Sequence, residues 1–188
     1  MKSSKVKKAS GAHPAFTDIP TLRKRARQHI DEGAVTSNYT ADRKAVIKLL
    51  NEALATELVC VLRYKRHYFM ATGIHAATVA AEFLEHANEE MRHADLIAGR
   101  IIQLRGEPNF SPDGLAARSH AEYAEGDTLK QMIKEDLIAE RIAIESYREM
   151  IGYLADQDTT TRRMLEEILA SEEEHAEDLS SLLEGLPS

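Results

Sequence analysis

Two Glu-x-x-His pairs and two single glutamates interrupt the apolar stripes of otherwise amphipathic segments. Glu57 precedes the first pair by 33 residues and Glu140 precedes the second by 32, so the two halves of the pattern repeat. In a helix, residues three apart project from one face, which lets a glutamate and a histidine approach the same ion. The candidate metal ligands are Glu57, Glu90, His93, Glu140, Glu172 and His175.

The types and number of these residues favour a pair of divalent metal ions. Burying an ionised carboxylate without a partner costs several kcal/mol, so four of them would exceed the stability of an ordinary domain. No lysine or arginine lies on the same stripes. Two divalent ions would supply about +4 charges, and two imidazoles would complete their coordination. Solvated surface pairs are the alternative in a chain that is 29% charged, but four matched interruptions near mid-helix favour metal.

Four long amphipathic helices are expected to position these residues. From about residue 41 onward, apolar residues recur at three- and four-residue spacing, and no segment alternates as a strand would. The sequence therefore predicts an all-α fold. The expected helices span 41–71, 76–105, 127–155 and 160–184, with boundary signals at Thr40, Gly73, Gly106 with Pro108, Asp127 and Thr159.

The lengths of the connections predict the topology. The links between the first two helices and between the last two are short, so each pair should be antiparallel. The middle link, residues 106–126, has 21 residues and two prolines. At about 3.3 Å per residue it can run the roughly 43 Å length of a neighbouring helix. We therefore expect a four-helix bundle with one long crossover.

A basic extension precedes the predicted bundle. Residues 1–40 are rich in Lys, Ser, Thr, Gly and Pro, with one short helix expected around Thr21–Glu32, and the bundle is expected over 41–184. Residues 1–28 carry about +7 and residues 29–188 about −14. Such an arm could contact DNA phosphates without reading sequence; the alternatives are a flexible solubilising arm or one that orders against a neighbouring subunit. The basic residues within 1–28 are Lys2, Lys5, Lys7, Lys8, Arg23, Lys24, Arg25 and Arg27, and the single acid in that range is Asp18.

The composition of the chain indicates its redox environment and its location in the cell. Cys60 is the only cysteine, so the chain can form no internal disulfide and supplies no paired thiolates for a zinc or rubredoxin-type site. No apolar run reaches the roughly 18 residues of a membrane span, and the basic amino terminus lacks the apolar stretch of a signal peptide. We expect a cytoplasmic protein with no membrane partner, and Cys60 as a small buried side chain.

Four segments resemble the helix cores of bacterioferritin, within the ferritin-like superfamily. They read ELVCVLRY (57–64), EEMRHAD (89–95), DLIAE (136–140) and SEEEH (171–175), and the resemblance covers about residues 45–180. It implies two iron ions per subunit, with manganese as an alternative. The implied roles are Glu57 with His93 on one ion, Glu140 with His175 on the other, Glu90 and Glu172 as bridges, Tyr64 beside the site and Asp136 orienting a histidine ligand.

Two features bear on how far the resemblance to bacterioferritin extends. The sequence given ends at Ser188, thirteen residues past His175, so we expect that family's fifth helix to be missing. Together with the basic arm and the crossover, this resembles the Dps-like branch, whose members build cages of twelve subunits. Met91 occupies the position of the haem-binding methionine, so haem b is an alternative cofactor, although methionine on a helix flank is more often a packing residue.

The expected function is oxidation of Fe(II) with O2 or H2O2 at a di-iron site within one subunit, coupled to iron storage. A homo-oligomeric cage of 12 subunits is expected, with 24 subunits or a dimer as alternatives. The rivals are a di-iron or di-manganese enzyme acting on peroxide or an organic substrate, and a DNA-binding protection protein of the Dps-like kind.

Overall fold

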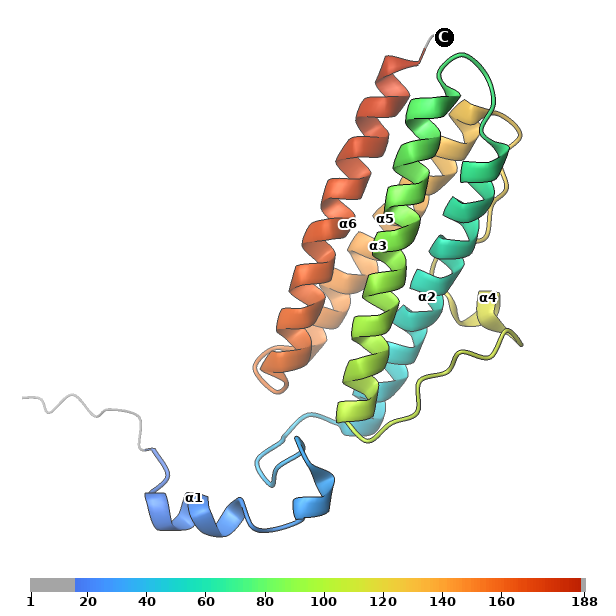
Figure 1. Cartoon of the computed structure of the whole chain (residues 1–188). Coiled ribbons are helices and arrows are strands. Elements are labelled where there is room, and N and C mark those ends of the chain that lie inside the picture. Colours follow the sequence, from blue (N-terminus) through green and yellow to red (C-terminus); the bar gives the residue numbers. More distant parts are fainter. Residues whose placement is uncertain (1–15, 187–188) are drawn as a thin grey trace, which may run out of the picture. The chain divides into compact units, whose positions relative to one another are not determined.

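The computed structural model describes residues 16–186, and all regular structure in that range is helical. The chain divides into two compact units, Met1–Asn38 and Tyr39–Ser188. The larger unit is a four-helix bundle with a long crossover, as the sequence predicts, and its four long helices run side by side in Figure 1. They are α2 (Arg43–Met70), α3 (Ala76–Gln103), α5 (Leu129–Leu154) and α6 (Thr159–Gly185).

Helix starts differ from the predicted caps by one or two residues. A cap needs an oxygen that accepts from the backbone N–H groups of the first turn. The Asp42 carboxylate accepts from two of them in α2, and Thr128 forms a reciprocal capping box with Gln131 in α5. The caps of α2, α5 and α6 are therefore Asp42, Thr128 and Asp158, and the predictions of Thr40, Asp127 and Thr159 were wrong.

Two antiparallel helix pairs form the bundle. Helix α2 packs along α3, and α5 along α6, with fewer contacts between the pairs. Apolar side chains make up much of the core between them, with Leu54, Phe83, Ile133 and Leu165 almost completely buried. Each such side chain contributes about 1.5–3 kcal/mol by leaving water, and this packing holds four helix faces at fixed distances from one another.

The crossover is longer than predicted and includes a short helix. It leaves α3 at Leu104, reaches α5 at Thr128, and forms α4 (Leu115–Arg118) on the way, after Gly114 in a left-handed conformation. Side chains of α2 fasten it along its length: Asn51 accepts from the Asn109 N–H at 2.7 Å, and Thr56 Oγ1 accepts from the His120 N–H at 2.9 Å. Polar anchors on one helix thus fix a segment that has little regular structure of its own.

The smaller unit contains α1 (Ile19–Arg25) and a 3-10 turn, Ile30–Glu32. The single helix predicted over Thr21–Glu32 is broken because His29 adopts a left-handed backbone conformation with φ of 49°. No residue of α1 is buried. The lysines at positions 2, 5, 7 and 8 lie outside the described residues, so DNA binding by the arm stays a prediction.

The burial of Cys60 and the hydrophobicity of the helices bear on two predictions made from the composition. Cys60 is buried and free, as expected. Among the helices of residues 16–186, none combines the length and the hydrophobicity that crossing a bilayer requires.

Candidate metal centre

The six candidate ligands converge at the middle of the bundle. Each of the four long helices contributes, because the three- and four-residue spacing places the interrupting residue of every stripe toward the common axis. The four carboxylate residues are at most 1% exposed and the two histidines at most 7%. The residues that meet are Glu57 from α2, Glu90 and His93 from α3, Glu140 from α5, and Glu172 and His175 from α6.

One half of this cluster surrounds His93. Its Nδ1 atom lies 3.4 Å from Glu57 Oε2, 3.4 Å from Glu90 Oε2 and 3.0 Å from Glu172 Oε1. Ligands that share one ion at about 2.1 Å stand roughly this far apart. These four atoms could therefore bind a single cation between them.

The other half surrounds His175 and uses the opposite oxygens of the same two central carboxylates. His175 Nδ1 lies 3.5 Å from Glu90 Oε1 and 3.6 Å from Glu172 Oε2, with Glu140 Oε2 at 3.9 Å. Glu90 and Glu172 thus turn one oxygen to each half, whereas Glu57 and Glu140 serve one half each. This geometry matches a paired site with two bridging and two terminal carboxylates.

Most of the atoms that face the two halves are buried without a hydrogen-bond partner. Leaving a buried polar atom unpaired costs about 1–3 kcal/mol, and more for a charged one. So many orphaned atoms in one place fit a centre that needs cations, and the donor set of carboxylates and imidazoles suits divalent metals. The unpartnered atoms are Glu57 Oε2, Glu90 Oε1, both Glu172 oxygens, Glu140 Oε2 and the Nδ1 atoms of His93 and His175.

Protonation in the metal-free protein shows how strongly these charges interact. Burial and the neighbouring Glu90 carboxylate raise the pKa of Glu57 to about 8, and burial likewise raises the pKa of Glu140. Burial opposes a charge on the imidazoles, but the nearby carboxylates of Glu172 and its neighbours outweigh this effect and raise the pKa of His93 and of His175 to about 12. Protons therefore occupy the centre when cations do not.

Two tyrosines hold the terminal carboxylates. Tyr64 donates its hydroxyl hydrogen to Glu140 Oε1, and Tyr147 donates to Glu57 Oε1. Tyr64 therefore lies beside the centre, as the resemblance implied. The role of Tyr147 was missed, although a signal existed: Tyr64 follows Glu57 by seven residues and Tyr147 follows Glu140 by seven. Each tyrosine bonds the glutamate of the other half.

The carboxylate that bonds the outer ring nitrogen of a candidate ligand histidine is Glu89, not Asp136. Glu89 Oε2 lies 2.7 Å from His175 Nε2, the ring nitrogen that faces away from the cluster. Asp136 instead accepts from Arg63 Nε at 2.7 Å and lies 2.8 Å from His67 Nδ1. The prediction for Asp136 was wrong because these two residues, one turn apart on α2, engage both of its oxygens.

His93 has different surroundings from His175. A groove of about 550 Å³ opens beside it and is lined by Asp95, Leu96 and Glu167 among others. Within residues 16–186, no side chain forms a hydrogen bond to the outer nitrogen of His93 corresponding to that of Glu89 with His175. The two halves thus share their inner contacts and differ in their outer ones.

His86 is a further residue near the centre whose importance the sequence analysis did not see. Its ring stacks on that of His175 with 4.1 Å between centroids, and its Nδ1 atom lies 3.2 Å from the Tyr64 hydroxyl. Burial and the nearby His175 lower the pKa of His86 to about 3, so this imidazole is neutral near pH 7. The only sequence signal was its place on the α3 stripe, one turn before Glu90.

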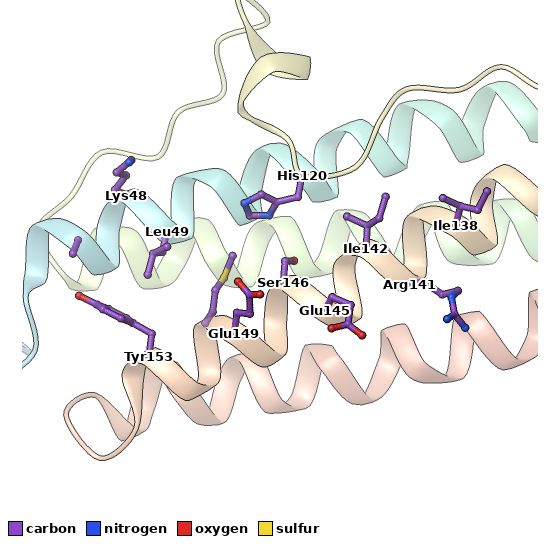
Figure 2. Close-up of a pocket in the computed structure, with 12 residues that line it drawn as sticks. Lys48, Leu49, His120, Ile138, Arg141, Ile142, Glu145, Ser146, Glu149 and Tyr153 are labelled. Atoms are coloured by element: carbon purple, nitrogen blue, oxygen red, sulfur yellow. The ribbon is translucent and has the colours of Figure 1, made fainter.

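Met91 and a second groove lie apart from the cluster. Met91 is 40% exposed on α3, beside the buried Glu90, and haem binding there stays a prediction. A groove of about 870 Å³ lies between α2 and α5 and is lined by Leu49, Ile142 and Tyr153 together with polar residues such as Glu145. Figure 2 shows these side chains along the groove. None of its lining residues belongs to a group of metal-ligand side chains in the described part of the chain.

Comparisons with known proteins agree with this fold. The family model of the ferritin-like domain matches residues 47–188. Bacterioferritin from Mycobacterium bovis is 34% identical over 140 residues, covering 74% of this chain and 84% of the relative, and bacterioferritin from Rhodobacter capsulatus is 32% identical over 138 residues, covering 72% and 81%. The chain therefore belongs to the ferritin-like family.

Solved structures give the same result. The dodecameric thioferritin of Bacteroides fragilis, a bacterioferritin-related protein, superposes with a TM-score of 0.73 at 35% identity and covers 76% of this chain and 86% of its own. Dps from Thermosynechococcus elongatus superposes equally well, with a TM-score of 0.73, at 23% identity, covering 77% and 96%. That second likeness concerns the fold alone.

Proposed function

We propose that the protein oxidises Fe(II) at a di-iron centre formed by its six buried ligands and stores the product as Fe(III). The observation that carries this proposal is the division of ligand atoms into two adjacent sets that share Glu90 and Glu172. A single metal would leave half of these buried atoms unpaired. The bacterioferritin relatives support iron as the metal.

The chain's own residues would act mainly by binding and orientation. Glu57 and His93 bind one Fe(II), Glu140 and His175 bind the other, and the two central glutamates hold the pair at a fixed separation. Carboxylates and imidazoles together tolerate both valences of iron, while manganese is the alternative occupant. Tyr64 and Tyr147 fix the outer oxygens of the terminal carboxylates, and hydrogen bonds of this kind keep metal ligands in position.

The reaction balances with either oxidant. Each Fe(II) gives one electron, so a pair supplies two. With two protons, these electrons reduce O2 to H2O2 or reduce H2O2 to two water molecules. The iron product then carries one more positive charge per ion. Acidic groups beside the centre, such as Glu89, would favour its movement toward a mineral.

A cage of identical subunits is the assembly that storage requires, and we propose twelve. The related Bacteroides fragilis protein is dodecameric. The bundle also exposes large apolar side chains that a subunit interface could cover, among them Phe69 at 76% and Ile74 at 94% exposure. Light scattering after size-exclusion chromatography should give about 250 kDa for twelve chains of 21.0 kDa. A dimer would contradict storage, although not oxidation.

The oxidation itself is tested by the initial rate of Fe(III) formation under air and with H2O2. The variant Glu90→Gln keeps the size of the side chain but removes the charge shared by both halves, and its rate should fall to that of Fe(II) in buffer. Glu85→Gln is the matched control, because Glu85 is an exposed glutamate on the same helix. Equal rates for wild type and Glu90→Gln would refute the assignment.

A further inference from the structure

A third group of metal-ligand side chains lies on the seam between α3 and α6. Glu82, His86 and Asp178 each offer a ligand atom, and these atoms lie within 4.8 Å of one another. His86 Nε2 stands 3.4 Å from Glu82 Oε1 and 3.9 Å from Asp178 Oδ2. Both distances exceed the normal length of a hydrogen bond between nitrogen and oxygen, about 2.7–3.2 Å. The nitrogen is thus surrounded by acceptors without being bonded to them.

The hydrogen bonds on the other side of the ring determine which nitrogen carries the hydrogen. The single hydroxyl hydrogen of Tyr64 goes to Glu140 Oε1. The 3.2 Å contact between Tyr64 and His86 Nδ1 must then take its hydrogen from the imidazole. Nε2, on the opposite side of the ring, faces the carboxylates of Glu82 and Asp178.

A cation between the three groups would contact all of them. The side chain of His86 is only 2% exposed, so protein rather than solvent surrounds most of the ring. Two ligands that are each about 2.1 Å from a tetrahedral ion are about 3.4 Å apart, close to the separations found here. The buried imidazole therefore distinguishes this group from an ordinary cluster of surface acids.

An ion could reach the group from solvent. The carboxylates of Glu82 and Asp178 are 29% and 48% exposed. They line a groove of about 390 Å³ together with His75 and Ser181. This space leaves room for water molecules to complete a coordination shell, so no further protein ligand is needed.

We propose that Glu82, His86 and Asp178 bind a third divalent transition-metal ion, separate from the pair at the centre of the bundle. One imidazole and two carboxylates suit Fe(II), Co(II), Mn(II) or Zn(II). The proposal does not depend on the oxidation of iron, since it concerns binding alone.

Occupation of the third site is linked to the central pair through His86. An ion on Nε2 fixes the hydrogen on Nδ1, where it bonds the Tyr64 oxygen, and Tyr64 in turn bonds Glu140. A ligand on one side of the ring thus stabilises the hydrogen-bonded position of a terminal carboxylate on the other.

Equilibrium binding of Co²⁺ to the metal-free full chain tests the proposal, with protein-bound Co²⁺ counted after dialysis. Wild type should bind three ions per chain, and Glu82→Gln combined with Asp178→Asn should bind two. Both substitutions preserve side-chain size at partly exposed positions, so the fold should be retained. The matched control combines Glu85→Gln with Glu177→Gln, exposed acids on the same two helices, and should still bind three.

A second variant separates this site from the central pair. Glu90→Gln combined with Glu172→Gln removes both bridging carboxylates and should leave one bound ion, whose visible absorption reports on a mixed imidazole and carboxylate shell. If the Glu82 and Asp178 variant binds as many ions as wild type, the proposal is wrong. It is equally wrong if the variant without the bridging carboxylates binds none.

Discussion

The two halves of the candidate metal centre have equivalent candidate ligands and unequal surroundings. Around His93 and around His175 stand the same donors: one terminal glutamate and one oxygen from each central carboxylate. Outside this shell they diverge, because Glu89 bonds the far nitrogen of His175 while His93 borders a groove. The repeat in the sequence accounts for the shared ligands. The environment of each half depends on neighbours that do not repeat, and we expect the ion at His93 to exchange with solvent faster.

The largest effect should come from a carboxylate that serves both halves. Glu90→Gln removes a ligand charge from each ion, so both metal-binding events should weaken, whereas Glu57→Gln should weaken only the event at His93. Calorimetric titration of the metal-free protein with Co²⁺ distinguishes them by the number of steps affected. Selective loss of one step in Glu90→Gln would contradict the bridging role.

The next largest effect should be on the stability of the fold rather than on metal binding. Asp136 and Arg63 are buried together, at 0% and 1% exposure, so Asp136→Ala strands a guanidinium without its partner. Removing one member of such a pair typically costs about 3–5 kcal/mol. Urea unfolding of the metal-free protein should show this loss. Folded Asp136→Ala should still bind metal at both halves, and loss of binding at His175 alone would restore the role first expected for Asp136.

The substitution Glu89→Gln directly tests the difference between the surroundings of His175 and those of His93. Outer contacts of this kind are typically worth about 10–100-fold in metal affinity, so the ion at His175 should bind more weakly by that factor. The ion at His93 should be unaffected because Glu89 makes no contact with that ring among the described interactions. Glu85→Gln is again the control. Equal weakening of both ions would show that the halves are not independent.

The smallest effects should come from the two tyrosines. Tyr64→Phe and Tyr147→Phe each remove one hydrogen bond to a terminal carboxylate, a change worth about 0.5–3 kcal/mol where the acceptor is charged. Because the bonds cross between halves, Tyr147→Phe should weaken the ion at His93, and Tyr64→Phe the ion at His175. Tyr68→Phe on the same helix α2 is a control. If Tyr147→Phe instead weakened the ion at His175, and Tyr64→Phe the ion at His93, the crossed pairing would be wrong.

Local sequence patterns were enough to predict the four long helices and the convergence of the six candidate ligands. A period of 3.6 residues determines which side chains share a face, and Glu-x-x-His spacing is a property of a single helix. Boundaries were less well predicted: Asp158, rather than the neighbouring Thr159, caps α6 because only its oxygen reaches the free N–H groups of the first turn. The break at His29 was not foreseen either, since a positive φ leaves no mark on periodicity.

Contacts between helices were decided only by the tertiary structure. Sequence placed Asp136 one turn before Glu140, but it could not show that Arg63 and His67 would reach it first. The crossed tyrosine bonds and the group of Glu82, His86 and Asp178 likewise join residues from different helices. Such pairings depend on the rotation and separation of packed helices, which the whole core sets jointly. The sequence alone therefore determined which residues could bind metal, and the fold determined which neighbours hold them.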